Sequence, residues 1–370
     1  MATGTKTIRQ IQPWIDEEEL IQLKRVVAST FVVEAELTRE FEERTRQLTG
    51  ARYAIAVTNG TMALYCCLKA LEIGPGDEVI VPDLTFIATA NAVIMAGATP
   101  VFCDVSEDTF CLDPQKAELL ISNRTKAIMP VHLYGQAADM DALGKLAAQR
   151  GLRIIEDAAQ GVGVRFNGRH VGTFGDMGIL SYYGNKTITC GEGGVILTDD
   201  QRLSQLSYRL KNHGRDGKGV FIHEHIGFNF SFTEMQAAIG VAQMGKLSRI
   251  IEKKAGIRDR YVQELAGLKR FRPAFIDPRC APVYWFTSFL TDDRDALRKY
   301  LGEHGIETRL FFYPLHLQPC YRSKVDLRGS FDVAGRIYDQ GLSLPSSYNL
   351  TDEDQAFVIS RIRDFYADRN

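Results

Sequence analysis

The sequence predicts an α/β protein, with a large domain built on a mostly parallel sheet and a smaller α+β domain at its C-terminal end. Two observations favour this fold class. Short β-rich runs alternate with helix-length segments through the first half of the chain, and strands joined by helices form parallel sheets covered on both faces. The chain also has 370 residues, more than one hydrophobic core usually fills, so a second domain is expected.

Seven strands are expected in the large domain, because each run is short, rich in β-branched and apolar residues, and bounded by turn or helix signals. The last two runs are separated by a Gly-rich turn instead of a helix, which predicts neighbouring strands across the middle of the molecule. The seven runs are residues 53–57, 78–82, 100–105, 126–133, 153–157, 179–183 and 194–198.

Helical segments are expected before and after these strands. Residues 14–48 interleave acidic and basic side chains, which favours one helical segment on the outside of a larger body, and residues 232–266 predict a long helix. The proline-containing segment FRPAFIDPRCAP then indicates a domain boundary. We therefore expect a large domain at residues 1–265 and a small domain at residues 266–370.

Composition and charge exclude several classes of protein. The net charge is −2, so no global basic excess favours binding to nucleic acid. The N-terminus lacks the apolar core of a signal peptide, and apolar stretches such as NAVIMAGATPVF are too short to span a bilayer. We expect neither nucleic acid nor a membrane as a partner.

Cysteine and histidine usage predicts a reduced, cytoplasmic protein without a metal centre. The chain has seven cysteines, an odd number, and no CxxC pair, which is typical of free thiols and not of a disulfide framework. His223 and His225 stand close together in FIHEH, but no partner ligands follow at a recognised spacing. A solvated loop is the preferred interpretation of this segment.

Candidate site residues follow the strands, because open α/β sheets bind ligands at the carboxyl ends of their strands. After the first strand, Gly60 and Thr61 stand at the start of an expected helix. Unpaired backbone amides and the helix dipole suit a phosphate at this position. A capped helix, with Asn59 or Thr61 as the cap, is the alternative interpretation.

Two further strands end in candidate ligand groups. Phe86 follows the second strand, where it is expected either to stack on a flat ligand or to pack in the core. Asp157 ends the strand RIIED beside Glu156, which indicates a crowded polar site where a buried carboxylate needs a cationic partner. The alternative for Asp157 is a helix N-cap.

Lys186 lies in SYYGNKTITCGEGG, between a β-rich run and a cluster of glycines. A lysine attacks a carbonyl when its pKa is lowered or its partner is polarised, and a strand-end pocket supplies either condition. The alternative is an exposed lysine in a surface turn. Taken together, a phosphate nest, an aromatic plate, an acid and a lysine match the requirements of pyridoxal 5′-phosphate (PLP).

At these residues the chain resembles the DegT/DnrJ/EryC1 family of sugar-nucleotide aminotransferases. The resemblance covers nearly the whole chain and implies the aspartate-aminotransferase-like fold of PLP enzymes (fold type I). The motifs that carry it are VTNGTMAL, VPDLTFIATANAV, EDAAQ, GDMGILSYYGNKTITCGEGGVILTDD, GFNFSFTEMQAAIGVAQM and FFYPLH, in the order of the family.

The resemblance implies a role for each candidate residue. Lys186 looks like the lysine that forms the Schiff base with PLP and moves the proton between the cofactor and substrate carbons. Asp157 looks like the partner of the pyridine nitrogen, Gln160 like the glutamine near the 3-hydroxyl and ring face, and Phe86 like the stacking aromatic. The implied phosphate ligands are Gly60, Thr61 and Ser181, with Asn229 reaching the phosphate of a neighbouring subunit. A homodimer with active sites shared across a two-fold axis is therefore implied.

The implied substrates are a nucleotide sugar and glutamate. YGNKTITCGEGG, FFYPLH and LSLPSS are similar to segments of the members that make GDP-perosamine, which aminate carbon 4 of GDP-4-keto-6-deoxymannose with glutamate as donor. Tyr313 and His316 are candidates to touch the sugar nucleotide, or else to pack between domains. The alternatives for function are another carbon, a UDP- or dTDP-linked ketosugar, a PLP-binding regulatory protein without turnover, and a plain nucleotide-binding protein.

Two departures from the family bear on the substrate pocket and the subunit interface. The chain has Gly161-Val162-Gly163 where the family often has Ala-His-Gly, and Asn229-Phe230-Ser231-Phe232 where it often has Asn-Tyr-Arg-Met. Neither departure removes an expected cofactor contact. One branch of the family replaces the lysine with histidine and dehydrates the sugar, and Lys186 argues against that branch.

Overall fold

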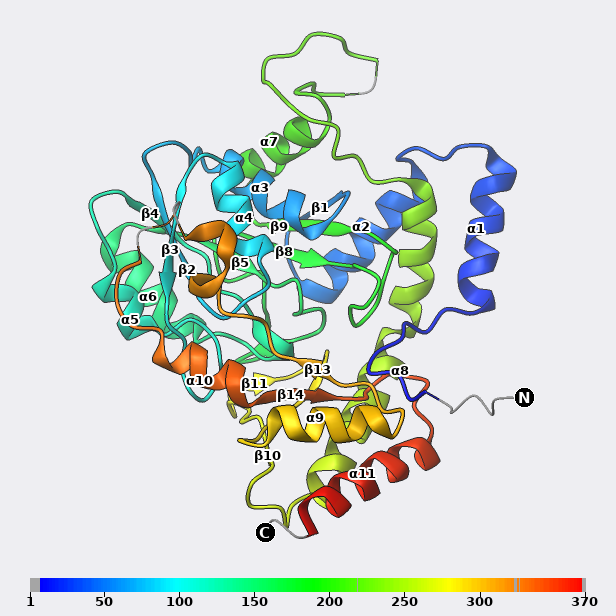
Figure 1. Ribbon diagram of the computed structural model, residues 1–370. Helices are drawn as coiled ribbons and strands as arrows, with labels where there is room; N and C mark the ends of the chain where they lie inside the picture. The colour runs from blue at the N-terminus through cyan, green and yellow to red at the C-terminus, as the bar shows by residue number, and fades with distance from the viewer. Residues whose placement is uncertain (1–6, 218, 323–324, 326, 368–370) are drawn as a thin grey trace.

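The computed structural model describes residues 7–217, 219–322, 325 and 327–367. Figure 1 shows a large α/β body above a smaller sheet with helices on its outer side. The long helix α8 (Glu234–Glu264) runs alongside both parts, from the top of the large body down to the smaller sheet. This helix confirms the long helix expected at residues 232–266.

The large body is built on a seven-stranded sheet in the order β1-β9-β8-β5-β4-β2-β3. Six strands share one direction and β9 runs opposite to its neighbours β1 and β8, so the predicted mostly parallel sheet is confirmed. All seven expected runs are strands of it, and the expected neighbours β8 and β9 pair directly. The strands are β1 (Tyr53–Val57), β2 (Glu78–Pro82), β3 (Thr99–Cys103), β4 (Thr125–Ile128), β5 (Arg153–Asp157), β8 (Met177–Ser181) and β9 (Gly194–Thr198).

One strand is shorter than expected. The run at residues 126–133 predicts a strand of eight residues, but β4 ends at Ile128. Pro130 lacks the backbone N–H that a central strand donates, which is why the ladder stops before it. The chain then turns through the short 3₁₀ segment Leu133–Gly135, where Tyr134 has a φ of 52°.

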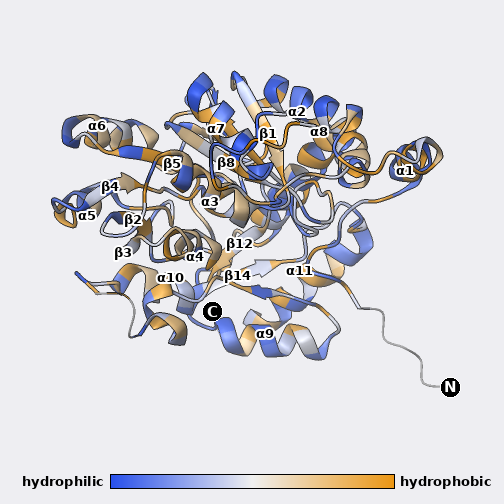
Figure 2. Cartoon of the chain, turned by 90° about the horizontal axis from the view of Figure 1, so that it is seen from above, coloured by the Kyte–Doolittle hydropathy of each residue, from blue (hydrophilic) through white to orange (hydrophobic). Residues whose placement is uncertain are grey.

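Both faces of the sheet are buried, as expected for strands joined by helices. Successive residues of β9 enter different cores: Val195 and Leu197 belong to one hydrophobic cluster and Ile196 to the other. The helices of this body are α2 (Glu36–Thr49), α3 (Gly60–Ala70), α4 (Ala88–Met95), α5 (Pro114–Leu119), α6 (Met140–Arg150) and α7 (Gln201–Lys211). In Figure 2 the helices α2 and α7 carry hydrophilic residues on part of their surface and hydrophobic residues on the rest, which is typical of amphipathic helices.

The N-terminal segment forms two helices where the sequence predicts one. α1 (Glu17–Ser29) ends at Thr30, which has a left-handed φ of 60°, and α2 begins at Glu36. The residues between them include Val32 and Val33, whose β-branched side chains are poor helix formers. The expectation of an outer position is confirmed, since α1 lies at the edge of the molecule in Figure 1.

The smaller sheet is antiparallel, in the order β10-β12-β14-β13. It confirms the expected α+β region near the C-terminus, while the boundary at 265/266 stays a prediction. Residues of this region also return to the large body, because the backbone N–H of Leu315 donates to the carbonyl of Asp83 (2.8 Å). The elements are β10 (Arg272–Pro273), β12 (Thr287–Leu290), α9 (Arg294–Glu303), β13 (Arg309–Leu310), α10 (Asp332–Gln340), β14 (Gly341–Leu344) and α11 (Asp352–Ala367).

A third, three-stranded sheet links the two regions. β11 (Cys280–Ala281) pairs with β6 (Arg165–Phe166), which pairs with β7 (Arg169–His170). Within the described part of the chain, none of the helices has both the length and the apolar character needed to cross a bilayer.

Candidate active site

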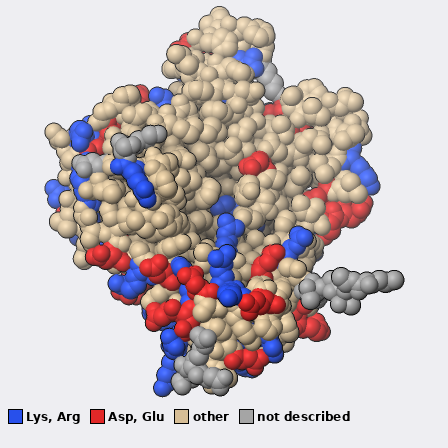
Figure 3. Space-filling model, in the orientation of Figure 1, with Lys and Arg blue, Asp and Glu red and all other residues tan. Residues whose placement is uncertain are grey.

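A cavity of about 450 Å³ lies at the carboxyl ends of the strands β1, β2, β5 and β8. It brings together seven of the ten residues that the sequence singles out. In Figure 3 a hollow near the centre of the face has basic side chains along its lower edge, while the surface above it is mostly uncharged. The predicted residues that line the cavity are Gly60, Thr61, Phe86, Asp157, Gln160, Ser181 and Lys186.

The N-terminus of α3 forms one end of the cavity. Asn59 is the N-cap, and its side-chain Oδ1 accepts the backbone N–H of Met62 (3.0 Å). Gly60 and Thr61 occupy the first two helical positions, whose N–H groups have no acceptor inside a helix. Ser181 lies close by, since a Cβ on Gly60 would stand 3.1 Å from the Ser181 Cβ. The capped helix is therefore confirmed, with Asn59 as its cap, and phosphate binding by Gly60, Thr61 and Ser181 stays a prediction.

Gly194 allows this turn to lie against the sheet. It pairs with Ser181 on one side and Val57 on the other, and a Cβ at this position would stand 2.5 Å from both the carbonyl carbon and oxygen of Asn59. Backbone atoms cannot yield to such contact as a flexible side chain can. The glycine therefore permits the close approach of β9 to the start of α3.

We expect Gly194→Ala to lower the free energy of unfolding by about 1–3 kcal/mol, because overpacking moves the Asn59–Gly60 backbone. Chemical denaturation measures this loss. Gly256→Ala is the matched control, since an added Cβ meets no atom within 4 Å there and the helix gains from alanine. Equal stability of Gly194→Ala and the unmodified protein would contradict the close-approach argument.

Asp157 and Glu156 point to opposite sides of the sheet, as successive residues of a strand do. Asp157 faces the cavity, where its Oδ2 accepts from the Thr89 hydroxyl (2.8 Å) and its Oδ1 accepts from the Ala159 N–H (3.1 Å). Burial raises the pKa of the Asp157 carboxyl, against the lowering effect of these hydrogen bonds. No helix begins at Asp157, so the N-cap alternative is wrong.

Glu156 points to the opposite face of the sheet, where backbone amides and His132 surround its carboxylate. Its carboxylate accepts the backbone N–H groups of Gly172 and Gly175 (2.7 Å each) and lies 2.9 Å from the Nε2 of His132. These contacts satisfy a fully buried carboxylate. The crowded polar site that the sequence predicts is thus two sites, and Asp157 alone belongs to the cavity.

Lys186 lies in the turn after β8, where its backbone N–H donates to the carbonyl of Tyr183 (2.9 Å). Its ammonium group stands 4.0 Å from the centre of the Trp285 ring. Burial lowers the pKa of Lys186 to about 7, the negative charge of Asp157 opposes this, and Arg309 adds to it. The lysine is therefore a cavity residue with a substantial neutral fraction at neutral pH, and the exposed-turn alternative is wrong.

Gln160 and Phe86 occupy the sides of the cavity. The Gln160 Oε1 accepts the backbone N–H of Tyr134 (2.7 Å). The backbone of Tyr134, which has a left-handed conformation, therefore holds the Gln160 side chain in place. Phe86 is 52% exposed, and its ring centre lies 5.8 Å from that of Phe312. The core alternative for Phe86 is wrong, because this exposure leaves a ring face open at the cavity.

Three of the predicted residues lie outside this cavity. Asn229 is exposed and forms an antiparallel bridge with Asn212. Tyr313 packs edge-on against Tyr338, with ring centres 5.2 Å apart. The third is His316. Roles for these residues in binding a neighbouring subunit's cofactor or the sugar nucleotide stay predictions.

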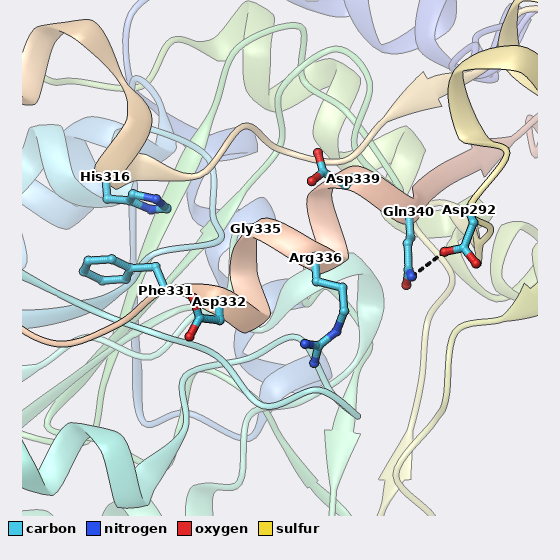
Figure 4. A pocket seen from close by; sticks show the side chains of 8 residues that line it. All are labelled: Asp292, His316, Phe331, Asp332, Gly335, Arg336, Asp339 and Gln340. Carbon is cyan, nitrogen blue, oxygen red and sulfur yellow. Dashed lines mark hydrogen bonds between the residues drawn. The ribbon is translucent and has the colours of Figure 1, made fainter.

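His316 lines a second, open pocket of about 530 Å³, whose other lining residues include Asp332 and Arg336 of α10 (Figure 4). Its Nδ1 lies 2.7 Å from the Oδ2 of Asp83, and its backbone N–H donates to the Oδ1 of Asp83 (2.8 Å). Its ring stacks on Phe331 at 4.5 Å. These contacts match the packing alternative, in which His316 joins the C-terminal region to the large body.

The sequence interpretation missed several cavity residues, among them Thr85, Trp285, Arg309 and Phe312. Trp285 and Arg309 lie in the C-terminal part of the chain, 99 and 123 residues from Lys186. No local pattern marks them, because only tertiary packing brings the second sheet against the first. Thr85 stands beside Phe86, and Asn185 beside Lys186, in segments already singled out, so the strand-end rule could have found both of these cavity residues.

The comparisons with known proteins agree with this geometry. The model of the DegT/DnrJ/EryC1/StrS aminotransferase family matches residues 13–363. GDP-perosamine synthase of Escherichia coli O157:H7 is 37% identical over 368 residues, which cover 98% of this chain and 100% of that protein. GDP-perosamine synthase of Caulobacter vibrioides is 41% identical over 331 residues, which cover 87% and 88%.

A solved structure confirms the fold class. The X-ray structure of S. venezuelae DesV in complex with a ketimine intermediate superposes with a TM-score of 0.91 at 35% sequence identity, covering 96% of this chain and 99% of that chain. The family match spans nearly the whole chain, as the motifs predict. The chain therefore belongs to the DegT/DnrJ/EryC1/StrS aminotransferase family and is a transferase enzyme.

Proposed function

We propose that this enzyme binds PLP and transfers the amino group of glutamate to a nucleotide-linked 4-keto-6-deoxy sugar, with GDP-4-keto-6-deoxymannose as acceptor and GDP-perosamine as product. The observation that carries the proposal is the placement of Lys186 and Asp157 in one cavity beside the open N-terminus of α3. The choice of sugar is supported by the two relatives named GDP-perosamine synthase.

The donor set of the cavity fits PLP. The backbone amides of Gly60 and Thr61 and the Ser181 hydroxyl suit a phosphate dianion. Asp157 suits a protonated pyridine nitrogen, because no ion pair within the described residues engages this carboxylate, and burial raises its pKa in a way that a cationic partner would offset. Phe86 offers a ring face, and Lys186 offers an amine for the aldehyde.

When bound, PLP supplies an electron sink for the carbon that loses its proton. The chain's own residues orient the reacting groups. Asp157 would stabilise positive charge on the ring nitrogen, and Gln160, held by the Tyr134 N–H (2.7 Å), would lie near the 3-hydroxyl and the ring face. Lys186 would hold the aldehyde carbon, and its free amine would move a proton between the cofactor carbon and the substrate carbon. Its pKa of about 7 suits both directions of this transfer at neutral pH.

Arg309 supplies a positive charge for an anionic substrate. It lines the cavity, and no carboxylate of the described residues lies within ion-pair distance of it. Its guanidinium lies over the ring of Phe286, 5.1 Å from the ring centre. Glutamate and a nucleoside diphosphate both carry anionic oxygens that a guanidinium binds with two hydrogen bonds.

We further propose a homodimer in which Asn229 completes the phosphate site of the neighbouring subunit. Asn229 follows a segment whose apolar side chains are exposed, and exposed apolar patches favour an interface. These side chains are Val220, Phe221, Ile222 and Ile226. Cytoplasmic location is part of the proposal, because all seven cysteines are free and six of them are buried.

A panel of nucleotide-linked ketosugars tests the substrate. Glutamate is expected to bleach the visible band of the lysine-bound cofactor, and GDP-4-keto-6-deoxymannose to restore it. We expect its kcat/KM to exceed that of the UDP- and dTDP-linked 4-ketosugars by at least about 100-fold, because buried polar contacts that lose their partner discriminate strongly. Equal recovery with a dTDP- or UDP-linked sugar would overturn the choice of nucleotide, and bleaching by no donor would overturn the transaminase.

A further inference from the structure

A buried lysine with no role in the proposed chemistry stands behind the cavity. Lys254 of α8 is 2% exposed, and its Nζ donates to two backbone carbonyls, those of Trp285 (3.1 Å) and Ser346 (2.8 Å). No carboxylate of the described residues pairs with it, and burial lowers its pKa to about 7. A buried amine is costly unless it is hydrogen-bonded, so these two contacts are what hold the Lys254 ammonium group in place.

The lysine acts on Trp285, which reaches into the cavity. Trp285 is 2% exposed. Its backbone N–H donates to the carbonyl of Val283 (2.7 Å), which closes a tight turn, and its ring stacks on Phe286 with the ring centres 3.8 Å apart. Its indole Nε1 donates to the carbonyl of Asn185 (2.6 Å), the residue just before Lys186. Backbone and side chain of the tryptophan are therefore both fixed.

The fixed ring contacts the reacting amine. The Nζ of Lys186 stands 4.0 Å from the ring centre of Trp285, close enough for a cation–π interaction, which is strongest for tryptophan and in desolvated sites. No described residue accepts a hydrogen bond from this Nζ. The ring is thus the surface on which the free amine rests, and the Asn185 contact fixes the backbone from which the lysine extends.

We propose that Trp285 is a positioning residue for the free amine of Lys186, and that Lys254 holds Trp285 in place from α8. This rests on the role proposed for Lys186. Three other charged residues line the same cavity, Asp157 of β5, Arg309 of β13 and Glu192 just before β9, and none of them contacts the amine within hydrogen-bond distance. Trp285 therefore determines the position of the Lys186 amine while that amine is not bonded to the cofactor.

The titration of Lys186 in the cofactor-free protein tests the proposal. Labelling by an amine-reactive reagent, followed by peptide mass spectrometry, gives the pH midpoint of this one amine. We expect the midpoint near 7 in the unmodified protein and about one unit lower in Trp285→Leu, because the ring stabilises the ammonium form. Trp285→Phe should fall between the two. Trp14→Leu is the matched control, since Trp14 also lies under a lysine, Lys246 (4.7 Å), and should leave the Lys186 midpoint unchanged.

Kinetics separate positioning from binding. Trp285→Leu is expected to lower kcat about ten-fold while the Kd for PLP changes by less than about three-fold, because the phosphate contacts lie elsewhere in the cavity. An unchanged Lys186 midpoint in Trp285→Leu, with turnover still dependent on Lys186, would overturn the inference alone. Turnover that survives the loss of Lys186 would overturn the proposed function itself.

Fluorescence tests the role of Lys254. The chain has two tryptophans, so Trp14→Phe leaves Trp285 as the single emitter. Adding Lys254→Met is expected to shift its emission to longer wavelength and to move the Lys186 midpoint in the same direction as Trp285→Leu. An unshifted emission and midpoint would remove Lys254 from the proposal. If this variant fails to fold, the two Trp285 variants still decide the role of the ring.

Discussion

Lys186→Ala is expected to abolish repeated amino transfer, with kcat lower by at least about 10⁴-fold. The variant loses the amine that holds the cofactor and the group that moves the proton, and a positioned acid–base group alone contributes about 10²–10⁴-fold. The effect is large because no second amine substitutes for it: Lys254 is buried behind the cavity, where two backbone carbonyls hold its Nζ. Steady-state kinetics with glutamate and the ketosugar measure the loss.

The matched control is Lys126→Ala, which removes an exposed lysine of β4 and should leave kcat unchanged. The visible band of the cofactor gives a second measurement, since the shift that marks a covalent bond to lysine should disappear in Lys186→Ala while PLP still binds through its phosphate. Full multiple-turnover activity in this variant would contradict both the assignment of the lysine and the proposed function.

The strands could be predicted from the sequence because their pattern is local. Residues 53–57, 78–82, 153–157 and 194–198 match strands of the structure residue for residue, since buried strands between turn signals leave a continuous apolar run. The break between α1 and α2 was missed, although the charge pattern on which the helix prediction rested stops at Arg25 and resumes only at Glu34. The break itself depends on a left-handed Thr30, a backbone conformation that the residue type does not indicate.

Only part of the cavity could be predicted from the sequence. Its strand-end residues, such as Lys186 and Asp157, follow from one rule about parallel sheets. Arg309 lies in β13 of the second sheet and Trp285 in the bend just before β12. Their approach to the cavity depends on how the two sheets pack, which no spacing in the chain records. The orientations of Glu156 and Asp157 could be predicted in part. Because successive side chains of a strand point to opposite faces, the two must diverge, but the alternation does not say which of them faces the cavity.

Asp157→Asn is expected to lower kcat by about 10²–10³-fold and to raise the stability of the cofactor-free protein. The loss of activity follows because a neutral amide no longer stabilises charge on the ring nitrogen, and one preorganised electrostatic contact contributes about that factor. The geometry should survive, since Asn can accept the Ala159 N–H and donate to the Thr89 hydroxyl. Asp113→Asn is the matched control, because Asp113 caps α5 outside the cavity.

The gain in stability follows from the sign of the pKa shift. Burial raises the pKa of the Asp157 carboxyl in the folded chain, so the folded chain binds this proton more readily than the unfolded chain does. The ionised carboxylate therefore costs stability above the unfolded pKa, and the cost is complete once the pH exceeds the folded pKa. Asparagine removes this cost at pH 7, which a higher Tm of the cofactor-free variant would register.

The difference in Tm should shrink at a pH below the unfolded pKa, where both side chains are neutral, and a lower Tm at pH 7 would contradict the argument. With PLP bound, the order is expected to reverse, because only the carboxylate pairs with a cationic ring nitrogen; the residue that weakens the empty protein is thus the one that binds the ring most tightly.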